Sequence, residues 1–269
     1  MYKLAVASSV SRDNGFDNLD ALSYAIENGF EGFQAFMNAQ MVNSAELRAK
    51  IRTICESNNL ALVAHAPATL SRINVMQDSA NTAARGLFSS DNKALVVHHY
   101  DETVSVEEAL ECLRYLQDFG ITPCLENYFV VGAETSEKCF NDYLYLITKS
   151  AMLGIDIIPV LDIPRIYHDR VNLTAKALEL LKEAFNVLSL IDRPIILHLI
   201  DVKDVSQVKS SWCSIGSGII PYSEIFSQLQ HYKISVYMTI LEYEDKINPL
   251  MSKQVLKDLF LTNKVREES

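Results

Sequence analysis

The chain has 269 residues, of which 49% are apolar, so it can bury a large core and does not have the composition of a disordered chain. Its 24 basic and 34 acidic residues give a net charge of −10, which disfavours a nucleic-acid partner because phosphate binding rests on Lys and Arg. No apolar run reaches the roughly 20 residues that span a bilayer, and the first residues enter a strand pattern without the apolar region of a secretion signal. We therefore expect a cytoplasmic protein without a membrane partner.

The cysteines are odd in number and form no C-x-x-C pair, which predicts reduced thiols and neither a disulfide framework nor a cysteine metal site. They are Cys55, Cys112, Cys124, Cys139 and Cys213.

Short apolar, β-branched runs alternate with longer runs of helical periodicity along the whole chain. In chain order, the predicted strands are Lys3–Ser8, Gly32–Met37, Leu60–Ala64, Ala94–Val97, Ile121–Leu125, Ile155–Leu161, Pro194–Leu197 and Ser235–Leu241. The predicted helices are Asn18–Asn28, Ser44–Ser57, Ser105–Phe119, Cys139–Leu153, Leu173–Leu188 and Ser252–Leu261.

Repeated strand–helix units predict parallel strands, because each crossover carries a helix. An open doubly wound sheet is the main alternative, but no glycine-rich phosphate fingerprint follows the first strand, and nine glycines are few for such a fold. Eight units without a linker rich in Pro, Gly or Ser suit closure better. We predict a single (β/α)₈ TIM barrel domain over residues 1–269.

Six consecutive predicted strands end in an ionisable side chain. These residues are His65, His98, Glu126, Asp162, His198 and Glu242, and neighbours in this series lie 28 to 44 residues apart, close to one strand–helix unit. In a parallel barrel, the carboxyl ends of the strands surround one mouth, where active sites of this fold lie. Side chains far apart in the sequence are therefore expected to share one pocket.

Three carboxylates at one mouth would repel one another unless a cation lies among them. Glu126, Asp162, His198 and Glu242 form an oxygen-rich set with one nitrogen ligand, which suits a divalent ion. Taken singly, a histidine at a strand end is more often a hydrogen-bonded structural residue, and an Asp or Glu can cap a helix. Glu244 is an alternative to Glu242, because both face the same side of an extended strand.

Several short motifs follow one another in a characteristic order along the chain. Leu125-Glu126-Asn127 and Val160-Leu161-Asp162 close the fifth and sixth predicted strands, and Leu197 to Lys203 reads Leu-His-Leu-Ile-Asp-Val-Lys. Ile215 to Ile220 reads Ile-Gly-Ser-Gly-Ile-Ile. With Glu242 at the eighth strand, this series resembles the xylose isomerase-like TIM barrel superfamily, which includes sugar phosphate isomerases and epimerases and the endonuclease IV-like family.

The resemblance implies one divalent metal ion held by Glu126, Asp162, His198 and Glu242, with Mn²⁺ expected first and Mg²⁺, Co²⁺ or Zn²⁺ as alternatives. It also implies that Glu126 and Glu242 are catalytic and exchange a proton at a substrate carbon, through an enediolate-type transfer. A metal bound to a carbonyl and its neighbouring hydroxyl would stabilise that state.

The chain departs from the family at two positions. Arg165 stands where endonuclease IV relatives and many sugar epimerases carry histidine, and Trp212 stands where a histidine usually precedes the Ile-Gly motif. A third metal therefore loses expected ligands, which together with the acidic charge argues against cleavage of abasic DNA. His65 and His98 resemble histidines of the first endonuclease metal, and they could hold a second ion, contact substrate or cap the barrel.

Arg165 provides a fixed positive charge suited to a carboxylate or phosphate, although pairing with a nearby acid is an equal alternative. The predicted substrate-binding residues are His65, His98, Arg165, His168, Lys203 and Trp212.

The first hypothesis is a metal-dependent isomerase or epimerase of a sugar, sugar phosphate or cyclitol. The second is a metal-dependent dehydratase or other lyase, or an endonuclease IV-like phosphoesterase, on the same barrel. The third is a non-catalytic barrel that binds a ligand. The resemblance further suggests a homodimer or homotetramer.

Overall fold

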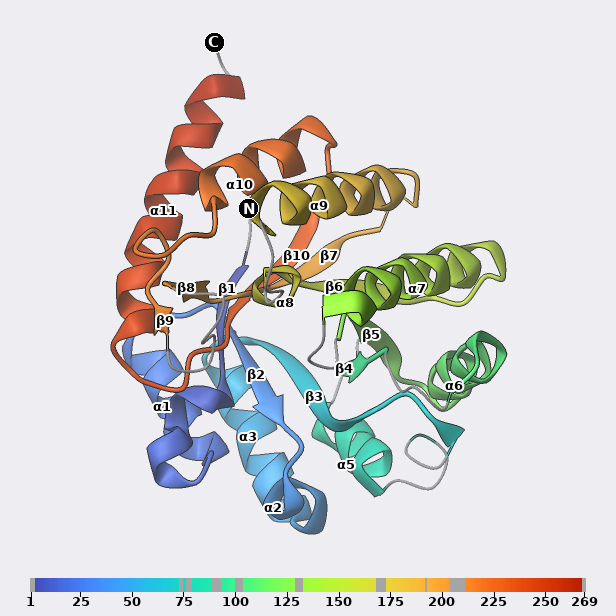
Figure 1. The fold of residues 1–269 in the computed structure, drawn as a ribbon. Helices are drawn as coiled ribbons and strands as arrows, with labels where there is room; N and C mark the ends of the chain where they lie inside the picture. Colours follow the sequence, from blue (N-terminus) through green and yellow to red (C-terminus); the bar gives the residue numbers. More distant parts are fainter. Residues whose placement is uncertain are drawn as a thin grey trace.

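The computed structural model describes residues 3–72, 75, 79–88, 93–99, 104–128, 133–167, 173–191, 193–203 and 211–267. Eight parallel strands close into a barrel in the order β1-β10-β7-β6-β5-β4-β3-β2 (Figure 1). They are β1 (Lys3–Ala7), β2 (Gly32–Phe36), β3 (Ala61–Thr69), β4 (Ala94–His98), β5 (Thr122–Glu126), β6 (Ile158–Asp162), β7 (Ile195–Leu199) and β10 (Val236–Leu241). The predicted (β/α)₈ barrel is confirmed.

Helices surround the strands on the outside of the barrel (Figure 1). They are α1 (Asn18–Glu27), α2 (Ala39–Asn43), α3 (Ala45–Ser57), α5 (Ser79–Leu87), α6 (Val106–Asp118), α7 (Ala133–Met152), α9 (Leu173–Ser189), α10 (Tyr222–His231) and α11 (Asn248–Glu267). A 3₁₀ segment, η1 (Ser8–Asn14), follows β1, and the four-residue helix α8 (Ile163–Ile166) follows β6.

Local sequence explains where the helices begin and end. Ser105 accepts a hydrogen bond from the Glu108 N–H and so caps α6, and after this helix the chain reverses at Gly120, whose φ is +79°. Three outer helices, α2, α5 and α10, were not among the predicted elements. α10 nevertheless carries a helical pattern, because Ile225, Phe226 and Leu229 are all buried.

The inside of the barrel is filled by a cluster of buried side chains distinct from the larger outer core. Its members are Ala5, Ala7, Val63, Ala94, Val96, Cys124, Val160, Ile196, Met238 and Ile240. Successive side chains of a strand point to opposite faces, so the residue two positions further along points inward again, one layer nearer the mouth. The six ionisable residues at the strand ends occupy that next layer, which is why they converge.

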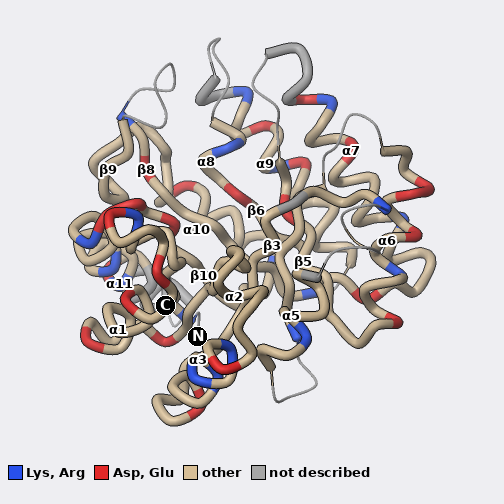
Figure 2. The backbone as a smooth tube through the Cα atoms, turned by 90° about the horizontal axis from the view of Figure 1, so that it is seen from below, with Lys and Arg blue, Asp and Glu red and all other residues tan. Residues whose placement is uncertain are grey.

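Basic and acidic residues are interspersed along the outer helices (Figure 2). In the part of the chain that the structure describes, no helix combines the length and apolarity needed to cross a membrane.

A short antiparallel pair, β8 (Asp201–Val202) and β9 (Trp212–Cys213), follows β7. The buried carboxylate of Asp201 organises the loop after it by accepting hydrogen bonds from four backbone N–H groups. The donors are Val202 at 2.9 Å, Gly216 and Gly218 at 3.0 Å, and Ile220 at 3.2 Å. This loop is the Ile-Gly-Ser-Gly-Ile-Ile motif, and both of its glycines donate their backbone N–H groups to the buried acid.

Gly218 lies so close to this acid that a Cβ atom there would overlap Asp201 Oδ1 and the Val202 carbonyl oxygen. We expect Gly218→Ala to lower the free energy of unfolding by about 2–3 kcal/mol, since both obstructing groups are fixed by the loop. Urea denaturation followed by circular dichroism measures this loss. The matched control is Gly154→Ala, where φ is +69° but no atom lies within 4 Å, and which should cost about 1 kcal/mol. Equal losses in the two variants would show that close packing against Asp201 and Val202 is not what restricts position 218.

Candidate functional site

A cavity of about 390 Å³ opens at the carboxyl end of the barrel, within the usual range of roughly 300–1,000 Å³ for small-molecule sites. Residues from both ends of the sequence line it. They are Ala7, Ser8, Ser9, Phe16, Gln34, Phe36, His65, His98, Asp162, Pro164, Arg165, Ile200, Trp212, Glu242 and Glu244.

Four of the predicted substrate-binding residues, His65, His98, Arg165 and Trp212, line the cavity. Lys203 is exposed and is not among the described lining residues. His168 lies outside the described part of the chain.

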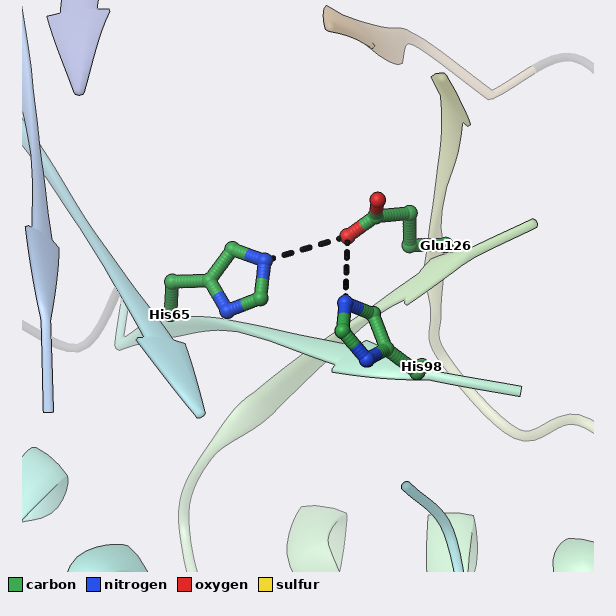
Figure 3. Close-up of side chains that lie close together, drawn as sticks. All are labelled: His65, His98 and Glu126. Carbon is green, nitrogen blue, oxygen red and sulfur yellow. Dashed lines mark hydrogen bonds and ion pairs between the residues drawn. The ribbon is translucent and has the colours of Figure 1, made fainter. Parts of the chain in front are cut away.

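Glu126, at the end of β5, lies beneath this lining and is completely buried. Its Oε2 atom is 3.1 Å from His65 Nε2 and 3.4 Å from His98 Nε2, so both rings point at one oxygen (Figure 3). Its Oε1 atom is 3.5 Å from His198 Nδ1 and 3.6 Å from Arg165 Nε. Three imidazoles and one guanidinium therefore surround a single carboxylate.

Gln34 on β2 connects two of the predicted metal ligands. Its side-chain oxygen lies 3.0 Å from His198 Nε2, and its side-chain nitrogen donates to Glu242 Oε1 at 2.5 Å. An amide oxygen only accepts, so His198 carries a proton on Nε2, and its second ring nitrogen is Nδ1. Burial opposes a charge on the ring, but the carboxylates of Glu242 and Glu126 outweigh it and hold the pKa of His198 well above its usual range, so Nδ1 is protonated in the metal-free site. That Nδ1 faces Glu242 Oε2 at 3.3 Å as well as Glu126. The histidine is thus oriented with its basic nitrogen toward the carboxylates.

Asp162, the last residue of β6, is fixed from two directions. Its backbone N–H donates to Asn127 Oδ1 at 2.7 Å, and Asn127 Nδ2 donates to the Asp162 carbonyl at 3.1 Å. Its Oδ1 accepts from the Arg165 backbone N–H at 3.2 Å and so caps α8. Its second oxygen, Oδ2, is 2.6 Å from Arg165 Nε. Asp162 therefore caps a helix and also contributes to the charged cluster.

Two stacked rings lie beside the charged cluster. The Tyr128 ring lies 4.1 Å from the His98 ring at an interplanar angle of 13°, and Arg165 Cζ lies 4.4 Å from the Tyr128 centroid. The neighbouring His99 is structural: its Nε2 donates to the Cys139 carbonyl at 2.8 Å and its Nδ1 accepts from the Tyr128 N–H at 3.0 Å. Burial lowers the pKa of His99 to about 4, which keeps the ring neutral.

Burial and mutual attraction compete in setting the charges. Burial opposes ionisation of Glu126, but attraction to His98 and His198 outweighs it and holds the pKa of Glu126 well below its usual range. Burial, together with the charges of Glu126 and Glu242, raises the pKa of Asp162 to about 7, although Arg165 opposes this shift. The cluster is an acid-rich site that draws in positive charge.

The residues present fit a divalent ion. Glu126, Asp162, His198 and Glu242 each offer one ligand atom, and these atoms lie within 4.8 Å of one another. Glu126 Oε1 and His198 Nδ1 are buried and have no hydrogen-bond partner, which is costly for polar atoms unless a ligand satisfies them. Glu244 lines the same cavity, but it pairs with Arg12 at 2.8 Å, so Glu242 is the better ligand candidate. In a second group, His65, His98 and Glu126 also have ligand atoms within 4.8 Å of one another.

Gln34 is the residue of this site that the sequence analysis missed. The available signal is a lone polar residue in the apolar strand Gly32–Phe36. It lies two positions after Gly32, whose Cβ position is 3.0 Å from Ala5 Cβ of the barrel interior. Gln34 therefore points inward in the same layer as the histidines and carboxylates.

We expect Gln34→Leu to weaken Mn²⁺ binding by roughly tenfold to a hundredfold, because His198 would lose the partner that fixes its ring and tautomer. Isothermal titration of the metal-free protein with Mn²⁺ measures the affinity. Gln254→Leu, on the exposed side of α11, is the control and should bind as the unmutated protein does. Unchanged affinity in a folded Gln34→Leu variant would show that His198 is oriented without Gln34.

No model of a known protein family matches the chain. No curated protein matches it either. Solved structures do match. A D-tagatose 3-epimerase-like protein superposes with a TM-score of 0.70 at 17% identity, covering 98% of this chain and 99% of that one.

Two further structures cover nearly all of both chains. The probable 3-DHS dehydratase AsbF, involved in petrobactin synthesis in Bacillus anthracis, has a TM-score of 0.64 at 13% identity and covers 95% of this chain and 98% of its own. The IOLI protein, solved with a zinc atom, has a TM-score of 0.63 at 16% identity and covers 97% of each chain. The chain therefore has the fold of the xylose isomerase-like TIM barrels.

Proposed function

We propose that this chain is a divalent-metal-dependent isomerase or epimerase that acts on a sugar, sugar phosphate or cyclitol. The observation that carries the proposal is that two carboxylates, the buried Glu126 and the partly exposed Glu242, lie next to the same histidine nitrogen. His198 Nδ1 lies 3.5 Å from Glu126 and 3.3 Å from Glu242. Such a pair places two proton acceptors at one reaction centre.

Two ionised carboxylates can exchange a proton with a substrate carbon. Burial opposes ionisation of Glu242, but His198 outweighs it and lowers its pKa, and the pKa of Glu126 is lowered as well. Both carboxylates are therefore ionised at neutral pH and can accept a proton. One would remove a proton from the carbon beside a carbonyl and the other would return it, as an enediolate-type transfer requires.

Glu126, Asp162, His198 and Glu242 would hold the ion. When bound, it would polarise the substrate carbonyl and its neighbouring hydroxyl and so lower the cost of removing the proton. The mixed oxygen and nitrogen donors suit Mn²⁺ first, and Mg²⁺, Co²⁺ or Zn²⁺ after it. The zinc atom in the IOLI protein supports a metal in this fold but does not select one for this chain.

A dehydratase is the second candidate, because AsbF, a probable 3-DHS dehydratase, shares the fold over nearly its full length. Both reactions begin with removal of a proton beside a carbonyl, and they differ in whether a hydroxyl then leaves. Product analysis separates them, since a dehydrated product has one water fewer than its substrate whereas an isomer has the same mass.

Glu126→Gln should abolish exchange of a substrate hydrogen with solvent, with a loss of at least about a hundredfold, because an amide cannot accept the proton. The measurement is deuterium uptake, by mass spectrometry, into a panel of ketoses, ketose phosphates and keto-cyclitols incubated with Mn²⁺-loaded protein in D₂O. Glu137→Gln, which removes an exposed partner of Lys176 on the outer helices, is the matched control. Retained exchange in Glu126→Gln would exclude the proposed role of this residue.

Metal binding is testable without a substrate. At a free Mn²⁺ concentration a hundredfold above its dissociation constant, the metal should add about 2.7 kcal/mol to stability by mass action. Thermal denaturation of metal-stripped protein, with and without Mn²⁺, Mg²⁺, Co²⁺ or Zn²⁺, reports the change. Asp162→Asn should remove most of it, since this variant loses one donor charge. The absence of a shift with all four ions would support a barrel that functions without a metal.

A further inference from the structure

We propose that the substrate carries an anionic group, a carboxylate or a phosphate, and that Arg165 binds it. This inference rests on the proposed function and narrows its substrate class. It follows from the position of one guanidinium, from the atoms that it covers, and from the partners that it would lose when a substrate enters.

Arg165 is held at the mouth by its backbone. It is the third residue of α8, whose first turn is capped by Asp162 and contains Pro164. Its side chain turns back over the cavity and remains one-third exposed. Among the described residues that line the cavity, Arg165 is the sole lysine or arginine. The cavity thus offers an incoming ligand one permanent positive charge.

The guanidinium is oriented as well as placed. It lies over the Tyr128 ring, with Cζ 4.4 Å from the centroid, and Tyr128 in turn stacks on His98. Stacking of this kind fixes the plane of an arginine and preserves its fork of donors. Neither terminal amino group of Arg165 donates a hydrogen bond to a described residue. A planar pair of free donors suits the two oxygens of a carboxylate or phosphate.

The guanidinium also covers the proposed base. Arg165 Nε lies 2.6 Å from Asp162 Oδ2 and 3.6 Å from Glu126 Oε1, and Glu126 does not itself line the cavity. Arg165 lines the cavity beside Glu126 Oε1, so a substrate carbon that approached this oxygen past Arg165 would displace the guanidinium. Nε makes no hydrogen bond of good geometry in its present place, so charge attraction, rather than directed bonding, is what holds it there.

This displacement favours an anionic substrate over a neutral one. When Arg165 moves, it loses the two carboxylates that balance its positive charge, and a neutral ligand supplies no negative charge in their place. The proposed divalent ion would balance the two carboxylates that Arg165 leaves. A carboxylate or phosphate on the substrate would supply the negative charge that Arg165 loses and would engage the free amino groups. The same step would expose Glu126, so recognition of the anionic group and opening of the site would occur together.

Binding measured by isothermal titration tests this inference without turnover. The probes for Mn²⁺-loaded protein are D-fructose, D-fructose 6-phosphate and 2-keto-D-gluconate, which differ in their anionic group. At least one acidic probe should bind at least about tenfold more tightly than D-fructose, and the comparison of the two acids identifies phosphate or carboxylate as the preferred group. A protein that binds D-fructose as tightly as the acids, or binds neither acid, overturns the inference.

Arg165→Gln should lose at least about tenfold of the affinity for the preferred acid and less than threefold for D-fructose. Arg165→Lys keeps the charge without the planar fork, so its affinity for the preferred acid should lie between those of the unmutated protein and Arg165→Gln. This variant also tests the inference if Arg165→Gln does not fold. Arg193→Gln is the matched control, because it removes an exposed arginine paired with Asp156 away from the cavity. Unchanged acid affinity in both Arg165 variants overturns the inference.

The two proposals fail in different ways. Acid binding that depends on Arg165, with no deuterium uptake into any probe, rejects the isomerase or epimerase and keeps the anion site. Deuterium uptake into D-fructose that is unaffected by Arg165→Gln keeps the enzyme and rejects the anion site.

Discussion

The arrangement of the whole site depends on one carboxylate that has no access to water. Glu126 is completely buried, and an ionised acid in that position is tolerated only if opposite charge and hydrogen bonds surround it. The chain supplies His65 and His98 to one oxygen and His198 and Arg165 to the other. Each of these side chains comes from a different strand–helix unit, so the environment of the acid depends on the curvature of the sheet between β3 and β7.

Much of this arrangement could be predicted, because in a parallel barrel the carboxyl ends of all strands meet at one mouth. His198 lies two residues after Ile196 of the barrel interior, and Asp162 lies two residues after Val160, so the pleat carries each polar side chain to the next inward layer. A strand-end position was therefore sufficient to place Glu126, Asp162, His198 and Glu242 together, and these four do converge. Their roles in catalysis and metal binding remain predictions.

What the sequence did not reveal depends on contacts between distant elements. Gln34 carries no motif, and its importance becomes apparent only when β2 meets His198 and Glu242 across the barrel. Glu242 and Glu244 face the same side of their segment, and their contacts separate their roles: Glu242 meets Gln34 and His198, whereas Glu244 pairs with Arg12. The helix α10 was not predicted, although its sequence has the apolar spacing of a helix. The hydrogen bonds from the amides of the Ile-Gly-Ser-Gly-Ile-Ile motif to Asp201, in contrast, become visible only in the folded loop.

The donor set is held by the fold itself. Gln34 fixes Glu242 and His198, while Asn127 and the cap of α8 fix Asp162. Arg165 meanwhile balances the acids from the cavity side. Structural zinc sites behave differently, because their ligands come together only when the metal binds. The donor set of this chain is prearranged, and Arg165, the cation that balances it, can be displaced. This leaves room for a labile metal ion and for a substrate whose anionic group binds Arg165. A carboxylate that acts as both metal ligand and base requires such a labile site.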